Sequence, residues 1–274
     1  MSLKHLLVHV DAGARTSERL DLAIAVAKRF GARLTGLFAE SGQLGPSIVA
    51  RRNPENVARA MAEARAAFEA RAAAAGVEGE WWQIEEADYA EVVGWTVRCT
   101  RYADLSVFGQ HEHREDGERV PADLVDQVLR DGGRPVLVVP SLGHHPDAGK
   151  RVLVAWTGSR EAARALADAL PFLERAEEVV VLSIQRPSAS EGGGKLPPVH
   201  VVPHLRAHGI EARWERLLTD DPSVADHVLN RAADVGADLV VVGAHEPGGL
   251  SARPHAGTTR DLLRSMTTPL LLSG

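Results

Sequence analysis

Residues 237–246, with the sequence ADLVVVGAHE, have the pattern of a buried strand that runs directly into a glycine-containing loop. The apolar run 239–242 is short and rich in β-branched residues, which is typical of a strand covered on both faces. The chain contains the stretch a second time, as ADLSVFGQHE at residues 103–112. The same offset of 134 residues places Pro135 and the strand that follows it on Pro269 and the last strand. Two blocks in one register indicate an internal duplication.

The composition is that of a globular protein. The 274 residues are 45% hydrophobic and 25% charged, and they are enough for two domains with a core each. The net charge of -6 argues against a broad nucleic-acid surface, and no apolar run reaches the roughly 18 residues of a membrane span. The single cysteine, Cys99, excludes an internal disulfide and is interpreted as a small buried apolar group. We therefore predict a cytoplasmic protein that binds neither nucleic acid nor membranes.

Strand and helix patterns alternate along both halves of the chain. Strands are predicted at 6–10, 33–39, 80–84, 105–108 and 136–139, and again at 152–156, 179–184, 211–217, 239–242 and 270–272. Helices are predicted between them, including a long one at 54–75 and others at 91–100, 121–130, 160–173, 199–208, 222–235 and 259–265. This alternation predicts parallel sheets with helices on both faces. The proline- and glycine-containing stretch 142–149 is the predicted linker between a domain at 1–141 and a domain at 150–274.

Several separate features resemble the universal stress proteins in their tandem two-domain form. They are the first strand ending at Asp11, the restart VLVAWTGSREAA at 152–163, the segment GADLVVVG at 236–243, and the ending 259–272. The resemblance covers nearly the whole chain. It implies a Rossmann-like α/β fold with an open five-stranded parallel sheet, flanked by helices, in each domain. It also implies that the last strands of the two domains pair across a pseudo-twofold axis, as in an intramolecular pseudo-dimer.

In the nucleotide-binding members of this family, an acidic residue ends the first strand and faces the adenine or ribose. The pattern G-x2-G-x9-G-[ST] follows the fourth strand and binds the phosphates, because glycines let backbone N–H groups approach an anion at a helix N-terminus. Carried onto this chain, the pattern gives as candidate ligand-binding residues Asp11, Thr157, Gly243, Gly248, Gly257, Thr258 and Thr259.

Both domains depart from this pattern. Counted from Gly243, the second glycine position holds Glu246 and the third holds Ala256, and a carboxylate would repel a polyphosphate. Thr157 stands where the acidic residue belongs. A shifted anion site at Gly257, Thr258 and Thr259, with Arg253 or Arg260, is the alternative. The first domain keeps Asp11 but has one glycine in an acidic loop, so Asp11 is predicted to be a turn residue or a helix-cap partner.

Other chemistry has weaker support. Three groups of loop histidines were considered as ligands: His111 with His113, His144 with His145, and His245 with His255. Their spacing matches no known metal motif, so no metal site is predicted. Catalytic signatures such as G-x-S-x-G, a Walker loop or C-x-x-C are not found either, and Ser159 is predicted to cap a helix.

Two functions follow from these observations. The first is a non-enzymatic, cytoplasmic stress-response protein with a degenerate nucleotide-binding loop, which requires no cofactor and acts through a protein partner or a small ligand. The alternative is a universal stress protein that binds ATP, and hydrolyses it slowly, in the cleft of the second domain. An enzyme acting on another small molecule rests on fold analogy alone. Further dimerisation is left open.

Overall fold

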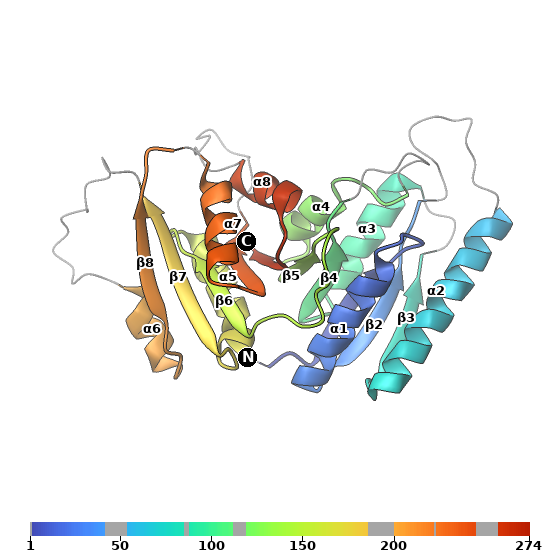
Figure 1. Ribbon diagram of the computed structural model, residues 1–274. Coiled ribbons are helices and arrows are strands. Elements are labelled where there is room, and N and C mark those ends of the chain that lie inside the picture. Colours follow the sequence, from blue (N-terminus) through green and yellow to red (C-terminus); the bar gives the residue numbers. More distant parts are fainter. Residues whose placement is uncertain are drawn as a thin grey trace. The chain divides into compact units, whose positions relative to one another are not determined.

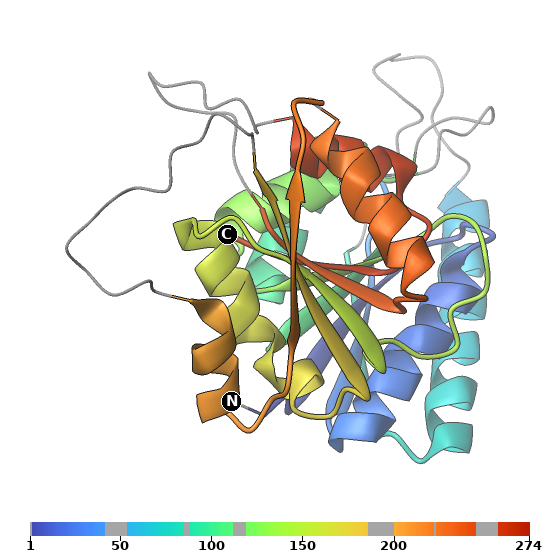
Figure 2. The ribbon, with the colours of Figure 1, turned by 60° about the vertical axis from the view of Figure 1, so that its left-hand side comes forward.

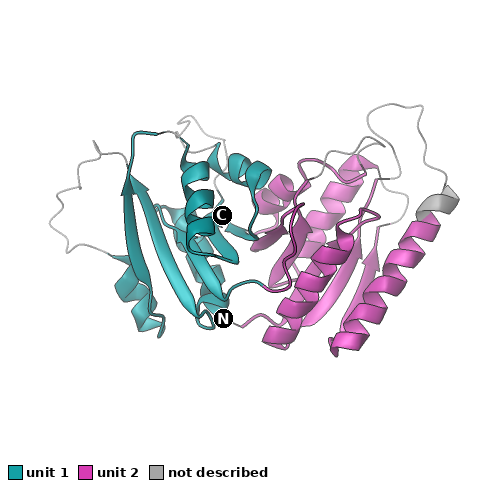
Figure 3. Cartoon of the chain, viewed as in Figure 1, with its two compact units in different colours: residues 1, 148–274 teal, residues 2–147 magenta. Residues whose placement is uncertain are grey.

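The computed structural model describes residues 2–41, 54–84, 88–111, 119–185, 200–221, 223–244 and 257–274. The chain divides into two compact units, residues 2–147 and 148–274, which we call the N-terminal and the C-terminal unit (Figure 3). The division falls inside the predicted linker. Within the described ranges, no helix combines the length and the hydropathy needed to cross a bilayer.

The N-terminal unit is a parallel sheet between two layers of helices. Its strands are β1 (His5–Val10), β2 (Arg33–Phe38), β3 (Gly79–Gln83), β4 (Leu105–Gly109) and β5 (Val136–Val139). Its helices are α1 (Thr16–Phe30), α2 (Pro54–Ala75), α3 (Tyr89–Thr100) and α4 (Leu124–Asp131). The strand order is β3-β2-β1-β4-β5, and every neighbouring pair is parallel. Helices α1 and α2 cover one face of the sheet, and α3 and α4 cover the other (Figure 1).

The C-terminal unit repeats this topology. Its strands are β6 (Arg151–Ala155), β7 (Glu178–Gln185), β8 (Arg213–Leu218), β9 (Leu239–Gly243) and β10 (Leu270–Ser273). Its helices are α5 (Arg160–Leu173), α6 (Val201–Ala207), α7 (Val224–Asp234) and α8 (Thr258–Ser265). The order is β8-β7-β6-β9-β10, again with parallel neighbours. The predicted fold class of parallel sheets flanked by helices is therefore confirmed, whereas the pairing across a pseudo-twofold axis stays a prediction.

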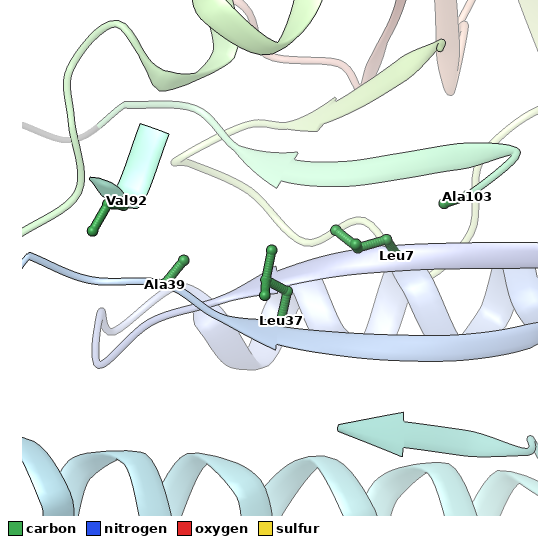
Figure 4. Close-up of a cluster of buried hydrophobic side chains, with 5 residues drawn as sticks. All are labelled: Leu7, Leu37, Ala39, Val92 and Ala103. Carbon is green, nitrogen blue, oxygen red and sulfur yellow. The ribbon is translucent and has the colours of Figure 1, made fainter. Parts of the chain in front are cut away.

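The core of the N-terminal unit shows why these sequences form covered strands. All six residues of β1 are buried, as expected for a central parallel strand. A cluster on the α3 side of the sheet is made by apolar side chains from β1, the β2 end, α3 and the turn before β4 (Figure 4): Leu7, Leu37, Ala39, Val92 and Ala103. Cys99 packs against this cluster half-buried, and burial raises the pKa of its thiol. Its interpretation as a largely apolar group agrees with this environment.

Helix ends follow local capping rules, and several of them differ from the sequence prediction. Ser159 caps α5 as predicted, since its side chain accepts the Ala162 N–H at 3.1 Å. Helix α7, however, begins after Ser223, while Asp221 accepts the Ser223 N–H in the preceding turn. Helix α4 begins three residues later than predicted, and α3 begins two residues earlier. The early start of α3 has a clear cause, the capping box between Asp88 and Glu91.

Candidate functional site

In both units the strand order reverses between the first and the fourth strand, β1 and β4 or β6 and β9. Ligands of open α/β sheets bind beyond the carboxyl ends of the strands at such a switch point. Asp11 follows β1 in the N-terminal unit. The other six candidate residues belong to the C-terminal unit, where Thr157 follows β6 and Gly243 ends β9.

The carboxylate of Asp11 is fully engaged by its own domain. One oxygen, Oδ1, accepts hydrogen bonds from the Gly13 N–H and the Thr16 hydroxyl, both at 2.6 Å. The other, Oδ2, is paired with Nη2 of Arg19 at 2.8 Å. Asp11 is thus both the turn residue that the sequence predicted and one half of an ion pair that the sequence did not reveal.

Arg19 lies on the inner side of α1 and is held from several directions. Only 5% of the residue is exposed. Its Nε donates to the carbonyl of His9 at 2.6 Å, and its Nη2 donates to Thr16 Oγ1 at 3.0 Å as well as to Asp11. A Cβ atom on Gly109, at the end of β4, would overlap Nη1 of Arg19. The glycine at this strand end therefore makes room for a guanidinium of the same domain.

Burial and charge set the protonation states in this cluster. Burial alone would raise the pKa of Asp11, but Arg19 and the hydrogen bonds from Thr16 and Gly13 more than offset it, so this pKa lies well below the usual range. His9 is 2% exposed, stacks on Phe108 at 5.5 Å between ring centroids, and shares a 2.9 Å hydrogen bond with the Ala39 carbonyl. Burial, helped by the Arg19 charge, lowers the pKa of His9 to about 4. At neutral pH the cluster is an aspartate–arginine pair beside a neutral imidazole.

In the C-terminal unit, the corresponding strand end contacts the first turn of α5. A Cβ atom on Gly243 would lie 2.5 Å from the Ala162 nitrogen and 2.6 Å from the Glu161 carbonyl carbon. These are backbone atoms of a helix that Ser159 caps, so they have little freedom to move away. Gly243 is required for this close packing of strand and helix. The role of Gly243 in a phosphate-binding loop stays a prediction.

The remaining candidate residues of the C-terminal unit have local roles. Thr157 is exposed and its hydroxyl accepts the Ser159 N–H at 3.4 Å, so it supports the turn into α5. Gly257 is the N-cap residue of α8 and its carbonyl accepts the Asp261 N–H at 2.9 Å. Thr258 and Thr259 are the first two residues of that helix, and Thr259 is buried. Gly248, together with Glu246, Arg253 and Ala256, lies outside the described residues.

Sequence reasoning missed a second buried polar group, at the end of β10. Asp168 of α5 is 8% exposed. Its Oδ2 accepts from Arg164 Nε at 2.8 Å and from the Ser273 hydroxyl at 2.7 Å. The sequence signal for the Arg164–Asp168 contact was their spacing of four residues, which places both side chains on one helix face. These contacts join α5 to β10, so the helix that packs on Gly243 is also fixed at the last strand.

Gly243→Ala is expected to lower the free energy of unfolding of the C-terminal unit by about 1–3 kcal/mol, because the added methyl group must displace helix backbone. Urea denaturation measures this loss. Gly257→Ala is the matched control, since its Cβ would lie 3.6 Å from the nearest described atom, on Asp261. The control should lose less than about 1 kcal/mol. Equal losses in the two variants would contradict the packing role of Gly243.

In the part of the chain that the structure describes, no group of three histidine, cysteine, aspartate or glutamate side chains could hold a metal ion. Of the loop histidines, His144 pairs with Glu18 at 3.0 Å and lowers the pKa of that carboxyl. His145 shares a hydrogen bond with the Leu142 carbonyl at 3.0 Å. His113, His245 and His255 lie outside the described ranges.

Comparisons with known proteins identify the fold and one of the two domains. Residues 149–273 match the model of the universal stress protein family. A universal stress protein from Archaeoglobus fulgidus DSM 4304 superposes with a TM-score of 0.73 at 17% identity, over 98% of this chain and 97% of that chain. A protein of unknown function from Pseudomonas aeruginosa PAO1 gives a TM-score of 0.59 at 15% identity, over 99% of this chain and 92% of that chain. A search of curated proteins finds no match.

Some solved universal stress proteins contain a nucleotide. One from Archaeoglobus fulgidus, in complex with dAMP, matches 50% of this chain and 98% of its own at 17% identity, with a TM-score of 0.35. A likeness of this size says nothing about the ligand of this chain. Residues 149–273 match the universal stress protein family, and over nearly its whole length the chain has the fold of a solved universal stress protein.

Proposed function

We propose that this universal stress protein acts by binding a protein partner or a small ligand, without binding or hydrolysing ATP. The observation that carries the proposal is the Asp11–Arg19 pair beside Gly109. A carboxylate that is to contact a sugar or a base needs open space next to it. Asp11 has both oxygens engaged by Gly13, Thr16 and Arg19, and the Arg19 guanidinium fills the space beside the end of β4.

The C-terminal unit supports the proposal in a different way. Thr157 brings no charge to the end of β6, and it serves the turn before α5. Gly243 has backbone of α5 packed against it, so its missing side chain is accounted for without a phosphate. The sequence adds Glu246, a repulsive charge, at the second glycine position of the family pattern. Each unit thus uses the glycine at the end of its fourth strand for internal packing. The cytoplasm is the proposed location, because a chain with one cysteine forms no internal disulfide.

Titration calorimetry of the full chain with ATP and Mg²⁺ tests the proposal. We expect no saturable heat at physiological ATP levels, and phosphate release equal to that of a protein-free blank. Thermal unfolding gives a second readout, because a ligand present at 100 times its dissociation constant would stabilise the folded state by about 2.7 kcal/mol. We expect no such rise in melting temperature.

Two variants locate any binding that does occur. Saturable ATP binding that is lost in Gly257→Glu would overturn the proposal in favour of a site in the C-terminal unit, before α8. Binding that is lost in Asp11→Asn would overturn it in favour of the N-terminal unit. Arg65→Ala is the control for the change in net charge made by Gly257→Glu, since Arg65 is exposed and pairs with Glu69 at 2.8 Å among the described residues.

A further inference from the structure

Helix α6 carries a row of three histidines, of which His204 and His208 are exposed. His200 is its N-cap residue, His204 lies in its last turn, and His208 is its C-cap residue. His204 and His208 are four residues apart at the end of the helix, a spacing that brings two side chains to one side of it. Val201 and Leu205 are the buried residues of the helix. Helix α6 is drawn in orange in Figure 1 and Figure 2.

Two of the three rings approach each other. The ring centroids of His204 and His208 are 4.9 Å apart, with an angle of 69° between the ring planes. Both residues are exposed. His200 is engaged elsewhere: its ring lies 4.3 Å from that of Trp214, and its Nδ1 accepts the Val202 N–H at 3.2 Å. The row therefore presents one close pair of imidazoles to solvent.

The separation of the two rings suits a shared metal ion. Imidazole nitrogens bind zinc at about 2.0–2.1 Å, which places the centroids of two rings on one tetrahedral ion about 5 Å apart. Imidazole is the ligand that Zn²⁺, Cu²⁺ and Ni²⁺ accept readily, whereas Mg²⁺ prefers oxygen. The 4.9 Å separation of the His204 and His208 centroids agrees with this distance.

The surroundings of the pair are compatible with a cation. The pair lies at the C-terminal end of α6, where the aligned peptide dipoles present partial negative charge. The nearest sequence neighbour with a positive charge, Arg206, is 3.6 Å from the carboxylate of Glu211 and is offset by it. Gly209, with a φ of 74°, ends the helix, and the buried Ile210 follows it. His208 therefore lies between two buried residues, Leu205 and Ile210.

We propose that His204 and His208 chelate a divalent transition-metal ion, Zn²⁺ or Cu²⁺, at the exposed end of α6. Two protein ligands leave coordination positions for water or for an outside ligand, as in open zinc sites. The site lies on the edge of the C-terminal unit beside β7 and β8 and does not depend on nucleotide binding. Neither residue belongs to the loop histidines that the sequence singled out.

Competition of the full chain with a chromophoric chelator for Zn²⁺ tests the site. Wild type should take up one more equivalent of Zn²⁺ than His204→Ala or His208→Ala. In each variant the affinity of this site for Zn²⁺ should fall by a factor of about ten or more, because even residues that only hydrogen-bond to a metal ligand contribute about 10–100-fold to affinity. Cu²⁺ should bind more tightly than Zn²⁺, and Mg²⁺ should not compete.

His144→Ala is the control, because it removes an exposed histidine from the N-terminal unit and should leave this equivalent unchanged. Circular dichroism of each variant checks that the chain is folded, as exposed positions should permit. A wild-type protein with no more Zn²⁺ than His204→Ala would overturn the proposal. The proposal would also be overturned if one alanine variant lost the bound equivalent of Zn²⁺ and the other retained it.

Discussion

Replacement of Arg19 by methionine is expected to lower the free energy of unfolding of the N-terminal unit by about 3–5 kcal/mol, the cost of removing one partner of a buried ion pair. The methionine fills much of the volume of the arginine stem. It leaves the carboxylate of Asp11 buried without its cation and the His9 carbonyl without its donor. Urea denaturation, followed by hydrogen exchange of the β1 amides, measures the loss in this unit.

Two further variants separate the charge from the packing. Adding Asp11→Asn to Arg19→Met removes the unpaired charge, so the double variant should recover about 0.5–3 kcal/mol relative to the sum of the single changes. Arg65→Met is the matched control on the exposed side of α2, where loss of an exposed pair should cost less than about 1 kcal/mol. An Arg19→Met protein as stable as this control would contradict the role of the pair.

The sequence predicted the elements well because their signals are local. Helices 54–75 and 160–173 have the bounds that the structure gives to α2 and α5, and all four residues of the run 239–242 are buried. Each depends on periodicity or capping within a few residues. The differences also have local causes. The shift of α3 to Tyr89 reflects the capping box at Asp88, a pattern that the sequence contained and the prediction did not use.

The candidate site was harder to predict, because a glycine has several explanations and sequence distance hides which one applies. Gly109 and Gly243 look alike in the repeated stretch. The first accommodates the side chain of Arg19, and the second accommodates backbone of Ala162, each from a helix distant in the sequence. In the sequence, a glycine required by close packing cannot be distinguished from a glycine required by a bound phosphate. Only the fold brings these partners together.

The Asp11–Arg19 pair illustrates the same limit. Asp11 stands in a loop and Arg19 on the second turn of α1, eight residues later. An arginine in an amphipathic helix is usually exposed, so nothing local distinguished Arg19 from Arg29 in the same helix. Its burial follows from the direction in which α1 packs on the sheet. By contrast, the His204–His208 spacing was a usable local signal, since residues four apart share a helix face.

Acidification is expected to destabilise the N-terminal unit through His9. Its pKa is about 4 in the folded state and near 6.5 when it is exposed, so between these values the unfolded chain binds more protons. The free energy of unfolding therefore rises with pH in this window, and the contribution of neutral His9 is lost as the pH falls from about 6.5 to about 4. The full difference is about 3 kcal/mol, and hydrogen exchange of the β1 amides across this range measures it.

His9→Gln should reduce this dependence, because glutamine can donate to the Ala39 carbonyl and does not titrate. A smaller slope should remain, because burial also lowers the pKa of His5 on the same strand. Asp11 does not mask the effect: its pKa is lowered, so the stability it contributes is present above the unfolded pKa and is lost only as the pH falls below about 4. His145→Gln, at an exposed histidine of the same unit, is the control and should keep the slope of wild type. A His9→Gln protein with that same slope would mean that His9 takes up its proton without unfolding the cluster that Arg19 and Asp11 form around it.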